Sequence, residues 1–118
     1  MANIQLQRGQ QQQVDVTLKD SGGGVIDLSS GKSAKLVIRR SLTGAIIDTL
    51  TGVSGNTDLR ILLKATAANI NLKWSTAEAT KLPNESVTVI GDLKISNISS
   101  GEVVHHIRLT FDITPEVV

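Results

Sequence analysis

The chain is poor in the residue types that most often signal a specialised chemistry. Its 118 residues contain no cysteine, no tyrosine, one tryptophan, one phenylalanine and two prolines. Without cysteine, neither a disulfide framework nor a thiolate metal site is possible. So few aromatic rings disfavour stacking on sugars or on single-stranded nucleic acid. The core must therefore be built mainly from Val, Ile, Leu and Ala.

The chain also lacks a strong charge of either sign and any long apolar run. It has 12 basic and 11 acidic residues, mixed along the sequence, so nucleic acid and membrane surfaces are disfavoured as partners. No apolar stretch approaches the ~20 residues that span a bilayer. The opening "MANIQLQRG" lacks the basic start and apolar run of a signal peptide, so we expect synthesis in a cytoplasm.

What the sequence does contain is alternation of apolar and polar residues. Short alternating segments are separated by turn clusters such as "DSGGGV", "SLTG" and "SNISSGE", which predicts about seven strands in an antiparallel β-sandwich. Ile26 and Leu28 also alternate around Asp27. The last two strands are expected to form a hairpin near the centre of the core, with Phe111 buried. The clearest strands are predicted at residues 14–18, 34–39, 69–74, 87–95 and 103–113.

One helix interrupts this pattern near residues 75–82. Ser75 and Glu78 have the spacing of a capping box, and Pro83 limits the helix to about two turns. A helix this short needs tertiary contacts, which we expect Ala79 and Leu82 to provide. It is therefore predicted to connect one sheet to the other across an end of the sandwich.

Two parts of the chain are expected, within the size of a single domain. Residues 1–13 form a polar N-terminal arm or a first edge strand, and residues 14–118 form one β-sandwich domain. Because "QRGQQQQ" is polar and supplies no burial of its own, we expect the arm to dock on a neighbouring subunit.

The sequence predicts no catalytic, cofactor-binding or metal-binding residue. His105 and His106 are adjacent, so on a strand they face opposite sides and cannot chelate one ion together. No G-x-S-x-G elbow is present, and "GGG" at 22–24 is not followed by the G-K-[ST] of a phosphate loop. The chain is therefore not expected to be an enzyme.

Four residues are candidates for an interface: Arg8, Arg39, Arg40 and Trp74. Arg39 and Arg40 end a predicted strand, where they form either a solvated edge that discourages sheet pairing or a contact with a partner. Trp74 is either a core residue packed near the short helix or part of a subunit interface, where tryptophan is enriched.

Four stretches taken together resemble one family. They are "IQLQRGQ", "VTLKDSGGGVIDLSSGKSAKLVIRR", "LKWSTAEATKLPNESVTVIGDLKIS" and "GEVVHHIRLTFDITPEVV". In this order they are similar to segments of the immunoglobulin-like domain of tailed-phage baseplate and tail proteins, of the kind at the N-terminus of baseplate upper proteins. Val87 and either Val89 or Ile90 stand where that family usually has an aromatic pair.

The resemblance implies an all-β, immunoglobulin-like sandwich that serves as a non-enzymatic structural protein of a virion. The expected role is a tail, baseplate or fibre-attachment component, present in several symmetric copies and packed against other virion proteins. A capsid decoration protein is the alternative within this class, and a module that binds host glycans is the alternative outside it. No cofactor is implied.

Overall fold

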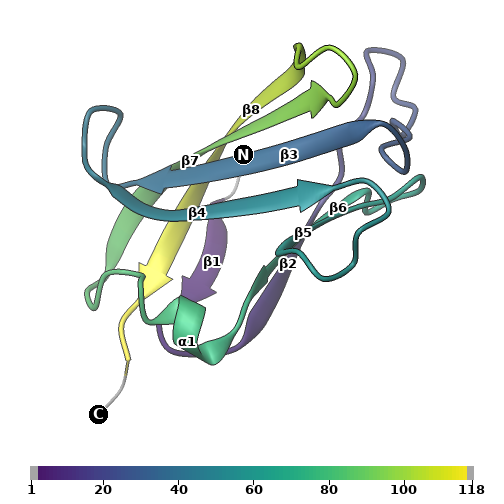
Figure 1. The fold of residues 1–118 in the computed structure, drawn as a ribbon. Helices are drawn as coiled ribbons and strands as arrows, with labels where there is room; N and C mark the ends of the chain where they lie inside the picture. Colours follow the sequence, from purple (N-terminus) through teal and green to yellow (C-terminus); the bar gives the residue numbers. More distant parts are fainter. Residues whose placement is uncertain (1–2, 117–118) are drawn as a thin grey trace.

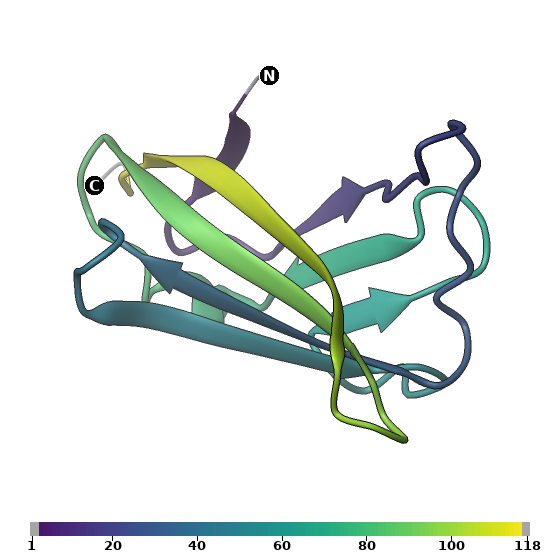
Figure 2. The same cartoon turned by 90° about the horizontal axis from the view of Figure 1, so that it is seen from above.

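The computed structural model describes residues 3–116, which fold into two β-sheets that face each other, with one short helix at one end (Figures 1 and 2). In chain order the elements are β1 (Ile4–Gln7), β2 (Gln12–Val16), β3 (Lys32–Arg39), β4 (Ile46–Val53), β5 (Ile61–Leu63), β6 (Ile70–Trp74), α1 (Thr76–Ala79), β7 (Val87–Asn97) and β8 (Val103–Thr114).

The strand order is that of an immunoglobulin-like sandwich. One sheet has the order β1-β8-β7-β3-β4, and the other has the order β2-β6-β5. Immunoglobulin-like sandwiches place strands B, E and D in one sheet and C, F and G in the other, and the variable type adds C′ beside C. The orders β2-β6-β5 and β8-β7-β3-β4 match these two sets. The predicted fold class is confirmed, with eight strands among the described residues where about seven were expected.

The N-terminal arm contains β1, which is part of the sandwich. This strand lies at the edge of the five-stranded sheet and pairs in parallel with β8, so the sandwich is not wholly antiparallel. Leu6 is only 1% exposed and belongs to the core. Alternation in "IQLQ" turns Leu6 inward, so the start of the arm contributes to the core, whereas none of the residues 7–13 that form "QRGQQQQ" is fully buried. β2 begins at Gln12, so a boundary after residue 13 falls inside a strand.

The alternation of Ile26 and Leu28 does not produce a strand. An isolated bridge joins Lys19 to Val25, and the Leu28 N–H donates to the Lys64 carbonyl at 3.0 Å. This segment carries the chain from the three-stranded sheet to the five-stranded one. It therefore runs alongside no single partner strand, although Leu28 is fully buried.

The two expected hairpins are present. β3 pairs with β4 through the "SLTG" turn, and β7 pairs with β8 over the longest ladder of the molecule. Phe111 on β8 is fully buried, as predicted, and packs edge-on against Trp74 on β6, with ring centroids 6.1 Å apart. A Cβ on Gly91 would lie 2.7 Å from Phe111 Cε2. Glycine at this position therefore leaves room for the phenylalanine ring.

α1 is a single turn, Thr76–Ala79, and shorter than the predicted span of 75–82. The capping box is confirmed: Ser75 Oγ accepts from the Glu78 N–H at 3.1 Å, and Glu78 Oε1 accepts from the Ser75 N–H at 3.0 Å. After Ala79 the backbone continues in tighter i to i+3 turns up to Leu82. Ala79 and Leu82 are buried, so the expected anchoring and the connection between the two sheets are confirmed.

Candidate interaction surfaces

Within residues 3–116, no group of three or more His, Asp or Glu side chains is placed to hold a metal ion. His105 is half-buried and His106 is exposed, on opposite sides of β8 as expected. In the same part of the chain, no helix is long and apolar enough to cross a membrane. What the surface offers instead is a polar network, a set of charged side chains on one sheet and exposed aliphatic groups at two turns.

Two of the four candidate interface residues, Trp74 and Arg8, hold elements of the fold together. Trp74 is 1% exposed, so it is a core residue and not a surface contact. Its ring lies in the core, where it packs against Phe111 of the opposite sheet and so joins the two sheets. Arg8 is half-buried: its Nε donates to the Leu82 carbonyl at 2.9 Å, and its guanidinium pairs with Glu116. Arg8 therefore holds β1 against the segment that follows α1.

The other two, Arg39 and Arg40, do not lie at a sheet edge. β3 is flanked by β7 on one side and by β4 on the other, so the interpretation of this pair as a solvated edge is wrong. Arg39 is half-buried and donates to the Gly44 carbonyl at 2.9 Å. Arg40 follows the strand, is exposed and pairs with Glu85. The four candidates therefore do not form one common surface.

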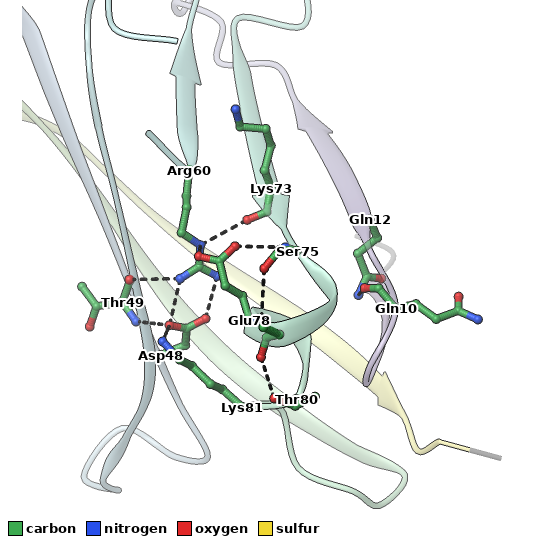
Figure 3. A network of polar contacts seen from close by, with 11 residues as sticks. Gln10, Gln12, Asp48, Thr49, Arg60, Lys73, Ser75, Glu78, Thr80 and Lys81 are labelled. Atoms are coloured by element: carbon green, nitrogen blue, oxygen red, sulfur yellow. Dashed lines mark hydrogen bonds and ion pairs between the residues drawn. The ribbon is translucent and has the colours of Figure 1, made fainter. Parts of the chain in front are cut away.

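A polar network ties the two sheets together near α1 (Figure 3). Asp48 on β4 has a side chain that is 1% exposed, and Arg60, just before β5, binds it through two hydrogen bonds of 2.8 and 3.0 Å. Glu78 of α1 lies 2.9 Å from Arg60 Nε and also caps its own helix. Lys81 Nζ is 3.6 Å from Asp48. Because Arg60 binds both carboxylates, the network joins β4, β5 and α1.

A shallow depression of about 290 Å³ lies beside this network. Polar side chains line most of it, including Gln11, Gln12, Lys73 and Glu78. Arg60 and Glu78 are already bound to each other at its wall. The depression therefore offers hydrogen-bonding groups, while the Arg60–Glu78 pair at its wall is engaged within the chain.

The outer side of the five-stranded sheet carries a group of charges that we call the basic face: Lys35, Arg39, Lys94, His106 and Arg108, with Asp92 among them. On β3, Ala34, Leu36 and Ile38 are buried, so the alternate residues point outward. The register brings outward residues of β3, β7 and β8 into rows. A hollow of about 220 Å³ is lined by members of this face.

Asp92 is the one carboxylate within the basic face. Its Oδ1 lies 3.2 Å from Arg108 Nε and 3.4 Å from His106 Nε2. Partial burial alone would raise the pKa of Asp92, but hydrogen bonding and charge from Arg108 and His106 hold that pKa below its usual value. Asp92 is therefore matched by neighbours on β8, and within residues 3–116 it forms no ion pair with Lys35 or Lys94.

Exposed aliphatic side chains gather at two turns at opposite ends of the five-stranded sheet. Ile98, Val103 and Val104 lie at the β7–β8 turn, where they are 53%, 48% and 38% exposed. Leu42 and Ile46 lie at the β3–β4 turn, where they are 57% and 53% exposed. The register places these turns apart, since the β7–β8 turn adjoins the start of β3 and the β3–β4 turn adjoins its end.

The basic face was not predicted from the sequence. Alternation had already turned Lys35 and Arg39 outward on one strand and Arg108 outward on another. Which outward residues stand opposite each other depends on strand register, which alternation within single strands does not give. The β7–β8 turn could have shown that Lys94 lies opposite His106, but no turn joins β3 to β7, so the pairing of Lys35 with Lys94 has no local signal in the sequence.

Comparisons with known proteins do not name a family. No protein-family model and no curated protein matches the chain. A solved structure of the NK cell receptor Nkp44, described as a triggering partner in natural cytotoxicity, is similar over 97% of this chain and 100% of that one, with 16% identity and a TM-score of 0.49. The assignment of the fold rests on the strand order and not on this likeness.

Proposed function

We propose that this chain is a non-enzymatic structural component of a tailed-phage virion, a tail, baseplate or fibre-attachment protein that packs against other virion subunits. The resemblance of four ordered segments to immunoglobulin-like phage domains motivates the class. The immunoglobulin-like strand order is consistent with it.

The observation that carries the proposal is the placement of exposed aliphatic groups at both ends of one sheet. Ile98 and Val104 lie at one end, and Leu42 and Ile46 lie at the other. Exposed apolar groups gathered in one place mark sites of protein contact more often than scattered ones do. A subunit with contacts at two ends can hold two neighbours, and many modest contacts add together in a symmetric assembly.

A glycan-binding role is less well supported by the surface. The single Trp and the single Phe of the chain are both buried, and the chain has no Tyr. The surface therefore offers no aromatic ring on which a sugar could stack. A capsid decoration protein would need the same kind of apolar contacts, so it stays as the alternative location within the virion.

Cryo-electron microscopy of the intact particle tests the proposal directly. The map is expected to contain this chain in several symmetric copies, with the β7–β8 or β3–β4 turn against a neighbouring subunit. A complete map of the particle that contains no copy would overturn the proposal. Density on the capsid surface would favour the decoration role over the tail.

A further inference from the structure

Strand register places like charges directly side by side on the basic face. Lys35 of β3 is the cross-strand partner of Lys94 on β7. Residues directly opposite on one side of a sheet have Cβ atoms about 4.5–5.5 Å apart, and like charges at that distance oppose folding. The pairing of these two lysines therefore lowers the stability of the isolated domain.

The rest of the face does not neutralise these lysines. Asp92 is already bound by Arg108 and His106, and Arg39 donates to a carbonyl rather than to a carboxylate. Neither Lys35 nor Lys94 forms an ion pair with any residue of 3–116. The face thus holds four Lys or Arg side chains against one carboxylate, whereas the whole chain is nearly neutral at +1.

From this excess of unpaired charge we infer that the basic face is a docking site for an acidic protein surface, one that presents several carboxylates to Lys35, Lys94 and the hollow between them. The occupant is not a second copy of the same face, because like charges would then meet across the interface. The inference depends on the proposed function in one respect only, namely that the partner is a protein.

The composition of the face favours a protein over a nucleic acid or a sulfated glycan. Half-buried Val37 and Ile90 lie among the charges, opposite Asp92 and Arg39 respectively, so the face mixes aliphatic and cationic contacts. Mixed contacts of this kind suit a protein surface with carboxylates around aliphatic groups. The face has no Trp, Phe or Tyr to stack on a base, since the single Trp and the single Phe are buried and the chain has no Tyr.

The test uses the full-length protein and labelled poly-L-glutamate as the carboxylate probe, measured by fluorescence anisotropy. A short DNA duplex and heparin are the comparison probes. We expect wild-type protein to bind poly-L-glutamate best, with weakening as salt rises from about 0.1 M to about 1 M, where the Debye length falls from about 10 Å to about 3 Å. The double variant Lys35→Gln/Lys94→Gln is expected to bind roughly tenfold more weakly.

The matched control is Lys19→Gln/Lys64→Gln, which removes the same charge from exposed lysines outside the five-stranded sheet. It should bind the probe like wild type. The face variant should also melt at the same temperature as wild type or higher, because it relieves like-charge repulsion, so a loss of binding cannot be assigned to unfolding.

Three results would overturn the inference: no binding of poly-L-glutamate by wild type, equal loss in both double variants, or tighter binding of DNA or heparin through the same lysines. Each of these leaves the virion proposal standing, because that proposal is decided by whether the chain is present in the particle. Conversely, absence from the particle would leave the binding data unchanged.

Discussion

The ion pair between Asp48 and Arg60 allows the sharpest test of how the two sheets are held together. Replacing Arg60 with Met would leave the Asp48 carboxylate, 1% exposed, with Lys81 Nζ at 3.6 Å as its nearest cation. Removing one partner of a buried ion pair costs about 3–5 kcal/mol. Since Arg60 is 18% exposed and Lys81 remains, we expect a loss of about 3 kcal/mol, at the lower end of that range.

Replacing Asp48, the other partner of the pair, should cost less stability. In Asp48→Asn, Arg60 keeps Glu78 at 2.9 Å, and the amide oxygen still accepts a hydrogen bond, so about 2 kcal/mol is expected. Because the two side chains act as a pair, the double variant should cost less than the sum of the single variants, by about 0.5–3 kcal/mol.

Urea denaturation followed by far-UV circular dichroism measures all three free energies of unfolding. Arg40→Met is the control, because the Arg40–Glu85 pair is about half exposed on both sides and should contribute less than about 1 kcal/mol. Strictly additive costs in the double variant, or a loss for Arg60→Met no larger than that for Arg40→Met, would refute the view that this network joins the sheets.

Three further variants test the core and the basic face. Phe111→Ala should lower the free energy of unfolding by about 3–5 kcal/mol in urea denaturation; a change below about 1 would mean that the ring is not central. Gly91→Ala should cost about 1–3 kcal/mol in the same assay, because its Cβ would crowd Phe111, whereas Gly22→Ala should be near neutral. Arg108 and His106 lower the pKa of Asp92 despite its partial burial, so its stabilising effect is present above the unfolded carboxyl pKa of about 3.9 and is lost as pH falls through the lower folded value. The stability gap between wild type and Asp92→Asn should therefore close below about pH 4, and a gap that persists in stronger acid would contradict this.

Much of the fold could be predicted because its strongest signals are local. The alternation that ends in Phe111, the turn at "SLTG" and the spacing of Ser75 and Glu78 each depend on only a few neighbouring residues. The helix came out shorter than predicted because the residues after Ala79 take tighter turns before Pro83. Local propensity identified the element, and packing set its end.

The predictions that failed concern contacts between segments that are distant in the sequence. Nothing within "IQLQ" shows that it pairs with residues 111–114, and its two inward side chains, Ile4 and Leu6, are easily overlooked in a polar context. Likewise, Arg39 looked like the end of an edge strand, whereas β7 and β4 flank β3 on both sides. Which strands pair depends on the topology of the whole domain, so the pattern within each single strand does not predict its partners.

The way this sandwich is held together also explains the character of its surface. In antibody domains a disulfide between strands B and F, packed on a Trp of strand C, pins the two sheets. Here the inter-sheet contacts include the aromatic pair of Trp74 and Phe111 and the ion pair of Asp48 and Arg60. Because the core takes both aromatic residues, the surface is left with aliphatic and charged groups. We therefore expect the proposed partners to be selected by aliphatic contact at the turns and by charge on the sheet, and Lys35 and Lys94 of the basic face are where that selection is most easily measured.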